Sequence, residues 1–267
     1  MSDTDASWSP LDPSVLEEAA GSAWSVTFLP SAESTNAVAA AHPVPGTIVV
    51  ADHQTAGRGR LDRAWETPPG SALTFSAVVE PELDDEDWPL LPLASALAVA
   101  DGVRRATDLD PRLKWPNDLL LDDDTAPEGA GERKFAGILL ERVPHPTDRS
   151  RAVAVIGIGI NVAMSRDQLP VPTATSLAIA GSHVDRTTIF GEVTRALATV
   201  LAELARDPEA VLDRYRGACT TLGRHVTVHL PDGEEFTGRA EAVDEHGRLV
   251  VDGRTVGAGD VVHVRPT

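Results

Sequence analysis

The sequence predicts an α+β protein in which a large domain of mixed strands and helices precedes a small all-β domain. A chain of 267 residues can form one large domain with a small companion. Apolar runs typical of strands alternate with segments of helical period up to about residue 220. From Leu222 onward, short alternating runs are separated by the turn sequences PDG, EHG and DGR. We therefore predict an acidic tail over 1–20, a large domain over 21–220 and a small barrel-like domain over 221–267.

The elements of the N-terminal half follow from local patterns. Cap-type residues at 31–34 precede an Ala-rich run that ends at Ala41, which indicates a helix. Residues 53–69 are rich in Gly, Arg and Pro without periodicity, so we expect a loop. The spacing of apolar residues over 88–106 predicts the longest buried helix. The remaining expected elements are a short helix over 13–20 and strands over 24–29, 47–52 and 71–80.

The C-terminal half of the large domain begins with a strand over 112–122 that Pro116 interrupts. The acidic, Gly- and Pro-containing stretch 122–133 predicts a long turn, and the strand over 134–143 is its hairpin partner. A buried strand rich in small residues follows over 152–163. Amphipathic patterns then predict helices over 188–205 and 209–219.

Charge and composition exclude several classes of protein. The net charge is −18, and no Lys or Arg precedes Arg58 although seven Asp and Glu do, which argues against nucleic-acid binding. The sequence contains no run of eighteen apolar residues, so we expect no membrane-spanning helix. The acidic N-terminus lacks a secretory pattern, so we expect a cytoplasmic protein. The single cysteine, Cys219, gives no disulfide framework or metal cluster and is expected to be a buried small residue.

The basic residues are unevenly chosen. Of 23 Lys and Arg, only Lys114 and Lys134 are lysine. An ammonium group is a compact point charge that a planar guanidinium does not reproduce. Both lysines fall in segments that carry other unusual residues, so we expect specific roles for them.

The sequence HQTAGRGRLDRAW, residues 53–65, contains the densest positive patch of this acidic chain. Glycine lets a backbone approach a ligand, and arginine offers forked donors to carboxylates and phosphates. The loop matches neither the P-loop pattern nor the dinucleotide-binding glycine pattern. By itself it predicts either an anion-binding loop or an ordinary solvated basic loop with weak RNA affinity.

Three later segments combine polar and small residues on strands. KWPND, residues 114–118, projects Asn117 and Asp118 at a strand break, although an ordinary hairpin turn has the same pattern. KFAGILLE, residues 134–141, has a Lys at a strand entry and Gly137 where a ligand can pass close to the backbone. GIGIN, residues 157–161, ends an apolar strand in Asn161, and a core strand with loosely packed glycines is the alternative.

Together these four segments closely resemble the biotin–protein ligase family in order and spacing, and Ser34-Thr35-Asn36 resembles the family's STN segment. The resemblance covers residues 24–267. It implies a mixed-sheet catalytic domain like that of class II aminoacyl-tRNA synthetases, followed by an SH3-like barrel. One departure is Asp62, where the family often has a glycine; this puts the flexibility and charge of the loop in question.

The resemblance also implies roles for individual residues. Lys134 would stabilise charge at the α-phosphate, Arg60 would act beside it, and Asp118 would be the base for the transfer step. Biotin would be bound by Ser34, Thr35, Gln54, Gly57, Arg58, Arg60, Lys134 and Gly137. ATP and the adenylate would be bound by Arg58, Arg60, Arg63, Asn117, Lys134 and Asn161. Trp65 and Trp115 are expected to be packing residues rather than stacking platforms.

The implied reaction joins biotin to ATP as biotinyl-5′-AMP and then passes it to a lysine of a biotin carboxyl carrier domain, of an acyl-CoA or pyruvate carboxylase. Two anions meet in the first step, so cations and Mg²⁺ delivered with ATP must offset their repulsion. A closed loop would protect the adenylate from water. We expect a monomer or weak homodimer.

Three alternatives remain at this point. A lipoate–protein ligase shares the chemistry, although GRGR with KWPND favours biotin. A bifunctional repressor–ligase would need a DNA-binding domain of some sixty residues before the catalytic domain, where we expect a segment of only about twenty residues that carries acidic and no basic side chains. A non-enzymatic binding module, with the C-terminal barrel as its functional part, is the third.

Overall fold

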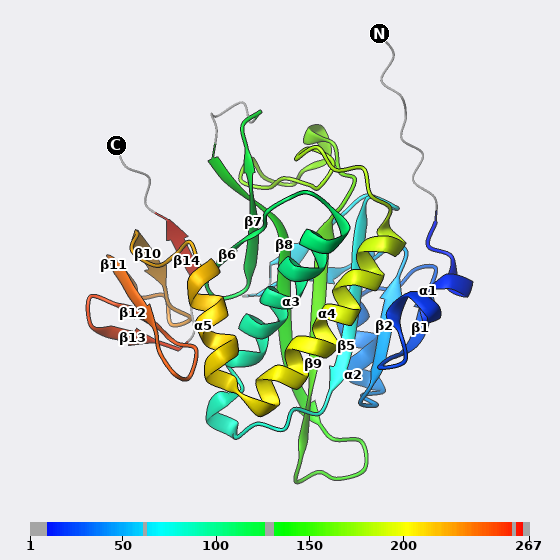
Figure 1. Cartoon of the computed structure of the whole chain (residues 1–267), viewed down its shortest axis with the longest axis horizontal. Coiled ribbons are helices and arrows are strands. Elements are labelled where there is room, and N and C mark those ends of the chain that lie inside the picture. The colour runs from blue at the N-terminus through cyan, green and yellow to red at the C-terminus, as the bar shows by residue number, and fades with distance from the viewer. Residues whose placement is uncertain (1–9, 61–62, 126–130, 258–259, 264–267) are drawn as a thin grey trace.

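The computed structural model describes residues 10–60, 63–125, 131–257 and 260–263. It confirms the predicted α+β class, with a mixed sheet and a separate C-terminal antiparallel sheet (Figure 1). The helices are α1 Pro13–Ala20, α2 Thr35–Ala41, α3 Leu90–Ala106, α4 Arg186–Arg206 and α5 Pro208–Ala218, with short 3₁₀ turns at Asp85–Asp87 and Arg166–Gln168. The strands are β1 Ser25–Leu29, β2 Thr47–Ala51, β3 Gly57–Arg58, β4 Ala64–Trp65, β5 Ala72–Val79, β6 Arg112–Lys114, β7 Asp118–Asp123, β8 Gly131–Pro144, β9 Ala152–Asn161, β10 His225–His229, β11 Glu235–Val243, β12 Leu249–Val251, β13 Arg254–Val256 and β14 Asp260–His263.

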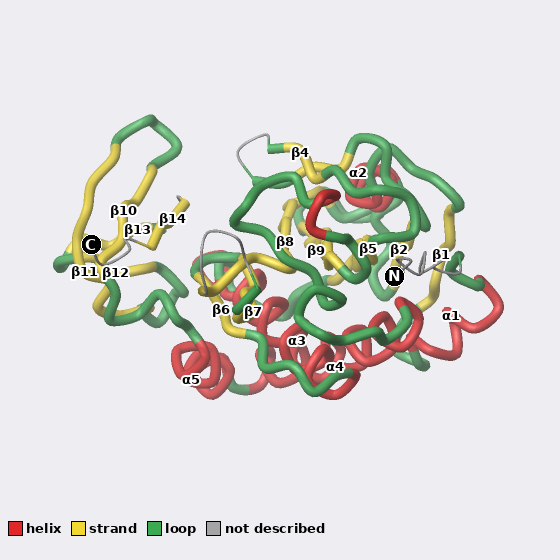
Figure 2. Tube along the Cα trace, turned by 90° about the horizontal axis from the view of Figure 1, so that it is seen from above, coloured by secondary structure: helices red, strands yellow, loops and turns green. Residues whose placement is uncertain are grey.

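The large sheet has seven strands in the order β1-β2-β5-β9-β8-β7-β6. Only β1 and β2 run parallel; every other neighbouring pair is antiparallel. Helices α1, α3 and α4 cover one face, and α2 lies on the other face together with β4 (Figure 2). The centre of the sheet is therefore covered on both sides, which explains why β5 and β9 are almost continuously apolar.

The core lies between the sheet and the α3–α4 layer. The Phe75 ring on β5 meets the Phe190 ring on α4 edge to face, with ring centroids 5.3 Å apart. Helix α4 starts after Asp185, whose carboxylate accepts a hydrogen bond from the Thr188 backbone N–H at 2.9 Å. Asp207 ends α4 and caps α5, and Pro208 occupies the first turn of α5.

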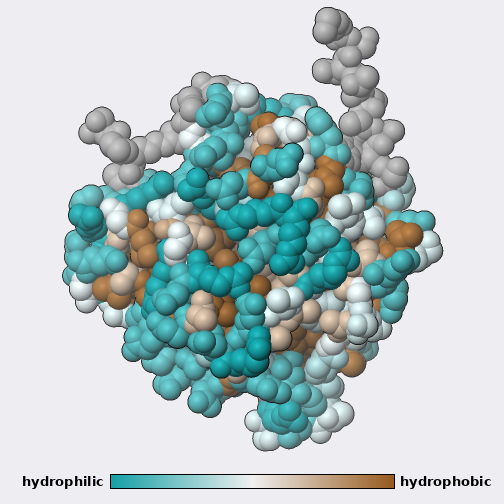
Figure 3. All heavy atoms as spheres, viewed as in Figure 1, coloured by the Kyte–Doolittle hydropathy of each residue, from teal (hydrophilic) through white to brown (hydrophobic). Residues whose placement is uncertain are grey.

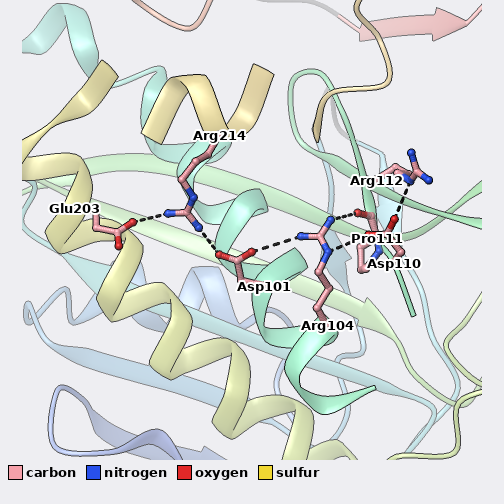
Figure 4. A network of polar contacts seen from close by, with 7 residues as sticks. All are labelled: Asp101, Arg104, Asp110, Pro111, Arg112, Glu203 and Arg214. Carbon is pink, nitrogen blue, oxygen red and sulfur yellow. Dashed lines mark hydrogen bonds and ion pairs between the residues drawn. The ribbon is translucent and has the colours of Figure 1, made fainter. Parts of the chain in front are cut away.

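A network of ion pairs ties the helices together on the outer side of this layer (Figure 4). Arg214 on α5 contacts Glu203 on α4 and Asp101 on α3, at 2.5 and 2.6 Å. Arg104 continues the network from Asp101 to Asp110 just before β6. The face that carries it is mainly hydrophilic, with hydrophobic atoms in scattered small areas (Figure 3).

The C-terminal strands form an antiparallel sheet in the order β13-β12-β11-β10-β14. It contacts the large domain through Trp115, between β6 and β7. The Trp115 backbone N–H donates to Thr221 Oγ1 at 3.1 Å, and its indole N–H donates to the Gly247 carbonyl at 2.9 Å. Arg224, just before β10, pairs with Glu132 on β8 at 2.6 Å. The C-terminal domain thus contacts the loop around Pro116 through the two hydrogen bonds of Trp115.

Two expectations about elements need correction. Residues 53–69 are not entirely loop, because Gly57 pairs with Trp65 and Arg58 with Ala64 in a short antiparallel hairpin. The Gly59 N–H donates to the Arg63 carbonyl at 2.6 Å and the Arg63 N–H donates to the Arg60 carbonyl at 3.2 Å, and hydrophobic periodicity does not predict either bond. Helix α3 is the more buried of the two long helices, with 12 buried residues among 17, but α4 is longer, with 21 residues of which 10 are buried. Helix α4 extends beyond the predicted range 188–205 at both ends, because Arg186 and Arg206 are charged and fall outside the apolar pattern.

The expectation that Cys219 is a buried small residue is confirmed. Cys219 is a free, buried cysteine beside β6, where it forms an isolated bridge with Leu113. No helix within the described ranges has both the length and the apolar character to span a membrane.

Candidate functional site

A pocket opens beside the start of α2 and the β3–β4 hairpin, with about 470 Å³ of empty space when the open solvent at its mouth is included. Its wall combines the start of α2, the hairpin, the Pro116 loop and the centres of β8 and β9. The lining residues are Ser34, Thr35, Asn36, Gln54, Arg58, Gly59, Arg60, Trp65, Thr74, Asn117, Lys134, Gly137, Ile138, Leu139, Gly157, Ile158 and Gly159. Segments up to 125 residues apart in the sequence therefore meet at one site.

The inner end of the pocket is built from buried hydroxyl and amide groups. Ser34 caps α2, and the adjacent Thr35 donates its backbone N–H to Gln54 Oε1 at 2.7 Å. The Thr35 hydroxyl donates to the same oxygen at 3.1 Å and accepts from Ser76 at 2.8 Å. All of these side chains are buried. The hydrogen bonds fix the hydroxyl and amide groups in place before any ligand arrives.

Glycines form the floor. A Cβ on Gly157 would lie 2.2 Å from Asn36 Oδ1, and one on Gly159 would lie 2.6 Å from the Trp65 ring. Asn36 cannot retreat easily, because its amide donates to Glu141 at 2.8 Å and its carbonyl accepts from Ser76 at 2.6 Å. The glycines of GIGIN therefore serve close packing at the pocket floor rather than only loosening a core strand.

The outer end of the pocket is cationic. Arg60 donates to Asn117 Oδ1 at 3.0 Å, and the Asn117 amide is itself anchored to the Ile138 carbonyl at 2.8 Å. Lys134 Nζ lies 2.5 Å from Asp118 and 5.6 Å from the centroid of the Trp65 ring. KWPND therefore contacts the Gly/Arg loop through Asn117 and β8 through Asp118.

Several predicted site residues do not line the pocket. Gly57 is buried behind it, against the Trp65 backbone and Gln54. Arg63 is exposed at the turn of the hairpin. Asn161 donates to the Thr175 carbonyl at 3.0 Å. Asp62 lies outside the described residues.

The structure also brings in residues that the sequence did not single out. Asn36 and Glu141 stand inside the STN and KFAGILLE segments, and Glu141 pairs with Arg58 at 3.2 Å as well as accepting from Asn36. Trp115 is a packing residue as expected, with 2% of its surface exposed. Trp65 packs on Gly159 and also lines the pocket. The available signal for Glu141 was an acidic residue directly after the apolar run 135–140.

Known proteins share this architecture and sequence. The biotin/lipoate A/B protein ligase family model matches residues 28–161, and the biotin protein ligase C-terminal domain model matches residues 221–264. The biotin–[acetyl-CoA-carboxylase] ligase of Mycobacterium tuberculosis is 36% identical over 99% of this chain and all of that protein. The bifunctional ligase/repressor BirA of Bacillus subtilis is also 36% identical, over 78% of this chain and 62% of its own length.

A solved structure agrees. The biotin protein ligase of Aquifex aeolicus in complex with biotin and ATP superposes with a TM-score of 0.74 at 26% identity, over 90% of this chain and 99% of that one. These matches favour the biotin branch of the family over the lipoate branch. The chain therefore belongs to the biotin/lipoate A/B protein ligase family, among the biotin protein ligases.

Proposed function

We propose that this protein is an ATP-dependent biotin protein ligase that works in two steps. In the first, the biotin carboxylate attacks the α-phosphate of ATP, which gives biotinyl-5′-AMP and releases pyrophosphate. In the second, the amine of a carrier lysine attacks the anhydride carbonyl, which forms an amide and releases AMP. One observation carries the proposal: a pocket with a buried hydroxyl and amide end meets three cations, Arg58, Arg60 and Lys134, in a protein of net charge −18.

The inner end suits the ureido ring of biotin. This ring presents one carbonyl acceptor and two N–H donors, so it needs both kinds of partner in fixed positions. In our proposal Ser34, Thr35 and Gln54 provide them, and Gly137 leaves room for the ring beside β8. Gly57 supports Gln54 from behind, and a side chain there would collide with the amide at 2.8 Å.

The outer end suits the reacting anions. Arg58 and Arg60 would lie over the biotin carboxylate and the phosphates, while Lys134 would stabilise the charge that grows at the α-phosphate. Asn117 would hold the nucleotide beside Arg60. Arg63 is proposed to reach the nucleotide from the hairpin turn, and Asn161 to support the adenosine side through its contact with Thr175.

Magnesium enters this proposal with the nucleotide. Within the described ranges, no three His, Cys, Asp or Glu side chains are grouped to hold a metal ion. The oxygen groups at the pocket edge belong to Asn117 and Asp118, and they contact Arg60 and Lys134. This donor set fits Mg²⁺ that arrives on ATP and touches one or two side chains. When bound, the ion would offset phosphate charge.

For the transfer step we propose Asp118 as the base that removes a proton from the carrier lysine. Asp118 is not among the residues that line the pocket, but its contact with Lys134, which does line it, holds the carboxylate next to the place proposed for the anhydride carbonyl. The carrier would be the biotin carboxyl carrier domain of an acyl-CoA or pyruvate carboxylase. The relative in Mycobacterium tuberculosis is named for acetyl-CoA carboxylase, which supports the first.

Three coarser features complete the proposal. We propose a cytoplasmic protein that is a monomer or weak homodimer. We also propose that residues 221–267 form an SH3-like domain that supports the catalytic domain through Trp115. The catalytic domain that we propose extends from about residue 11 to residue 220 rather than over 21–220 after an acidic tail of 1–20, because Leu11, Leu16 and Ala20 are buried in the main core.

The reaction is tested by exchange of labelled pyrophosphate into ATP, with biotin, lipoate or no acid present. We expect exchange with biotin alone, followed by labelling of a carrier domain. Exchange with lipoate and none with biotin would contradict the proposal. Biotin affinity by calorimetry without any exchange would instead identify a non-enzymatic binding module.

A further inference from the structure

The backbone of Lys134 is held in an unusual way for a residue inside a strand. Strand β9 ends at Asn161, and its pairing with β8 begins only at Ala136. On the other side of β8, Leu119 of β7 pairs with Ala136 and Leu120 pairs with Lys134. The register therefore shifts by one residue, and Phe135 has no partner on β7. At Lys134, β8 therefore has an open edge where β9 would otherwise continue.

Segment 173–175 fills that edge. The Lys134 N–H donates to the Thr173 carbonyl at 2.9 Å, and the Thr175 N–H donates to the Lys134 carbonyl at 2.8 Å. The contact is an isolated parallel bridge centred on Ala174. This segment belongs to the connection between β9 and α4 and has no strand of its own, so something else must fix its position.

Thr175 is the residue through which the segment is fixed. It is completely buried, and each of its polar groups is used. Its carbonyl accepts from the Asn161 amide at 3.0 Å, its N–H donates to Lys134, and its hydroxyl donates to Asp123 Oδ2 at 3.3 Å. The last contact links the segment to the end of β7.

Asp123 is a buried carboxylate at the centre of a charged cluster. Its other oxygen, Oδ1, accepts from the Thr125 hydroxyl at 2.9 Å and from Arg166 at 3.1 Å, while Arg133 Nε lies 4.0 Å from Oδ2. Burial by itself would raise the pKa of Asp123, but the hydrogen bonds from Thr125 and Arg166 outweigh it and hold the pKa below its ordinary value. The carboxylate is therefore charged at neutral pH and is a strong acceptor.

We propose that Thr175 and Asp123 are positioning residues for adenylate formation: their contact fixes segment 173–175, which fixes the backbone of Lys134 and thereby the aim of its ammonium group. The inference rests on the proposed function, since it assumes that Lys134 acts on the α-phosphate. A displacement of about 1 Å at a catalytic group can cost on the order of 100-fold in rate. If the backbone of Lys134 is less well fixed, we expect kcat for adenylate formation to fall while the affinity of the pocket for biotin and ATP stays nearly unchanged.

Thr175→Val tests this, because it removes the hydroxyl while keeping the branched shape and both backbone hydrogen bonds. We expect kcat for biotinyl-adenylate formation to fall about 10-fold, with less than a threefold change in KM for biotin and ATP. Thr175→Ser, which keeps the hydroxyl, should stay within about twofold of the unchanged enzyme.

Thr194→Val is the matched control. Thr194 is also completely buried, but its hydroxyl donates within α4 to the Phe190 carbonyl at 2.8 Å. This variant should keep its kcat, which separates a positioning effect from the general cost of deleting a buried hydroxyl.

Asp123→Asn is the second variant and decides the matter if Thr175→Val does not fold. It preserves side-chain size but removes the charge, and we expect a similar fall in kcat with KM nearly unchanged. Normal kcat in the folded variants at both positions would overturn the inference, as would an equal fall in Thr194→Val. Absence of biotin-dependent exchange in the unchanged protein would instead refute the proposed function.

Discussion

At the scale of single residues, Asp118 lies between the chain's two lysines. Lys134 Nζ is 2.5 Å from its carboxylate and Lys114 Nζ is 3.9 Å away. The two lysines of this arginine-rich sequence thus lie at the same place in the structure, on either side of Asp118. Two ammonium groups around one carboxylate leave a local positive charge beside the pocket, where the proposed reaction brings anions together.

We expect Lys134→Ala to lower the rate of adenylate formation by about 100- to 1,000-fold, because it removes the cation proposed to act at the α-phosphate. Single-turnover measurement of biotinyl-adenylate checks this. The unfolding temperature should change little, since the ion pair is partly exposed to solvent and Lys114 remains beside Asp118. Lys134→Arg keeps the charge but not its compact shape, and should retain only part of the rate. A near-normal rate in the alanine variant would remove Lys134 from the mechanism.

At the scale of elements, β9 presents two glycines to the pocket, and their neighbours differ. Gly157 faces the Asn36 carbonyl, which is fixed by hydrogen bonds, whereas Gly159 faces the side chain of Trp65. A side chain at 157 therefore collides with a group that other contacts hold in place. The strand works as a floor because it carries no side chains at these positions.

Gly157→Ala should weaken biotin binding by about 10-fold or more and destabilise the fold by about 1–3 kcal/mol, the usual cost of overpacking. Calorimetric titration with biotin and thermal unfolding measure the two effects. Gly131→Ala is the matched control on β8, because a Cβ there meets nothing within 4 Å. If Gly157→Ala bound biotin as tightly as that control, Asn36 would be able to move away from a side chain at position 157, which would contradict the prediction.

Elements were predictable where a periodic pattern runs long enough. The strands over 71–80 and 152–163 and the helix starting after Ser34 appear within a few residues of their expected limits. The β3–β4 hairpin was not predictable, because two residues in each strand carry no periodic pattern. The bridge between Lys134 and Ala174 was not predictable either, because it joins a strand to a connecting segment forty residues away.

At the scale of the whole molecule, the C-terminal sheet and the large domain meet around Thr221. His263 on β14 lies 3.1 Å from the Thr221 hydroxyl and 3.2 Å from Arg224. Thr221 in turn accepts from the backbone of Trp115, which leads into the Pro116 loop. Burial, together with the positive charges of Lys114 and Arg224, lowers the pKa of His263 to about 4. The imidazole is therefore neutral in the folded protein at neutral pH.

This gives a pH dependence of stability with a definite sign. An unfolded His titrates near 6.5, so between about pH 6.5 and pH 4 the unfolded chain binds more protons than the folded one. The free energy of unfolding should therefore fall as pH drops through this window, by up to about 2 kcal/mol at pH 4.5 from His263. Thermal unfolding at pH 7.5 and pH 4.5 measures the change. His263→Gln should show a smaller fall; an equal fall in the variant would assign the effect to other groups.

The sequence by itself determined the fold class, the family and the segments that meet at the pocket, because periodicity, turn residues and the four motifs are local properties of the chain. Tertiary structure alone decided which side chains touch. It brought Glu141 to Arg58, both lysines to Asp118, and Thr175 between Asn161, Lys134 and Asp123. These contacts join residues on different strands and loops. Their partners are set by sheet order, register and burial, which arise only when the whole domain packs.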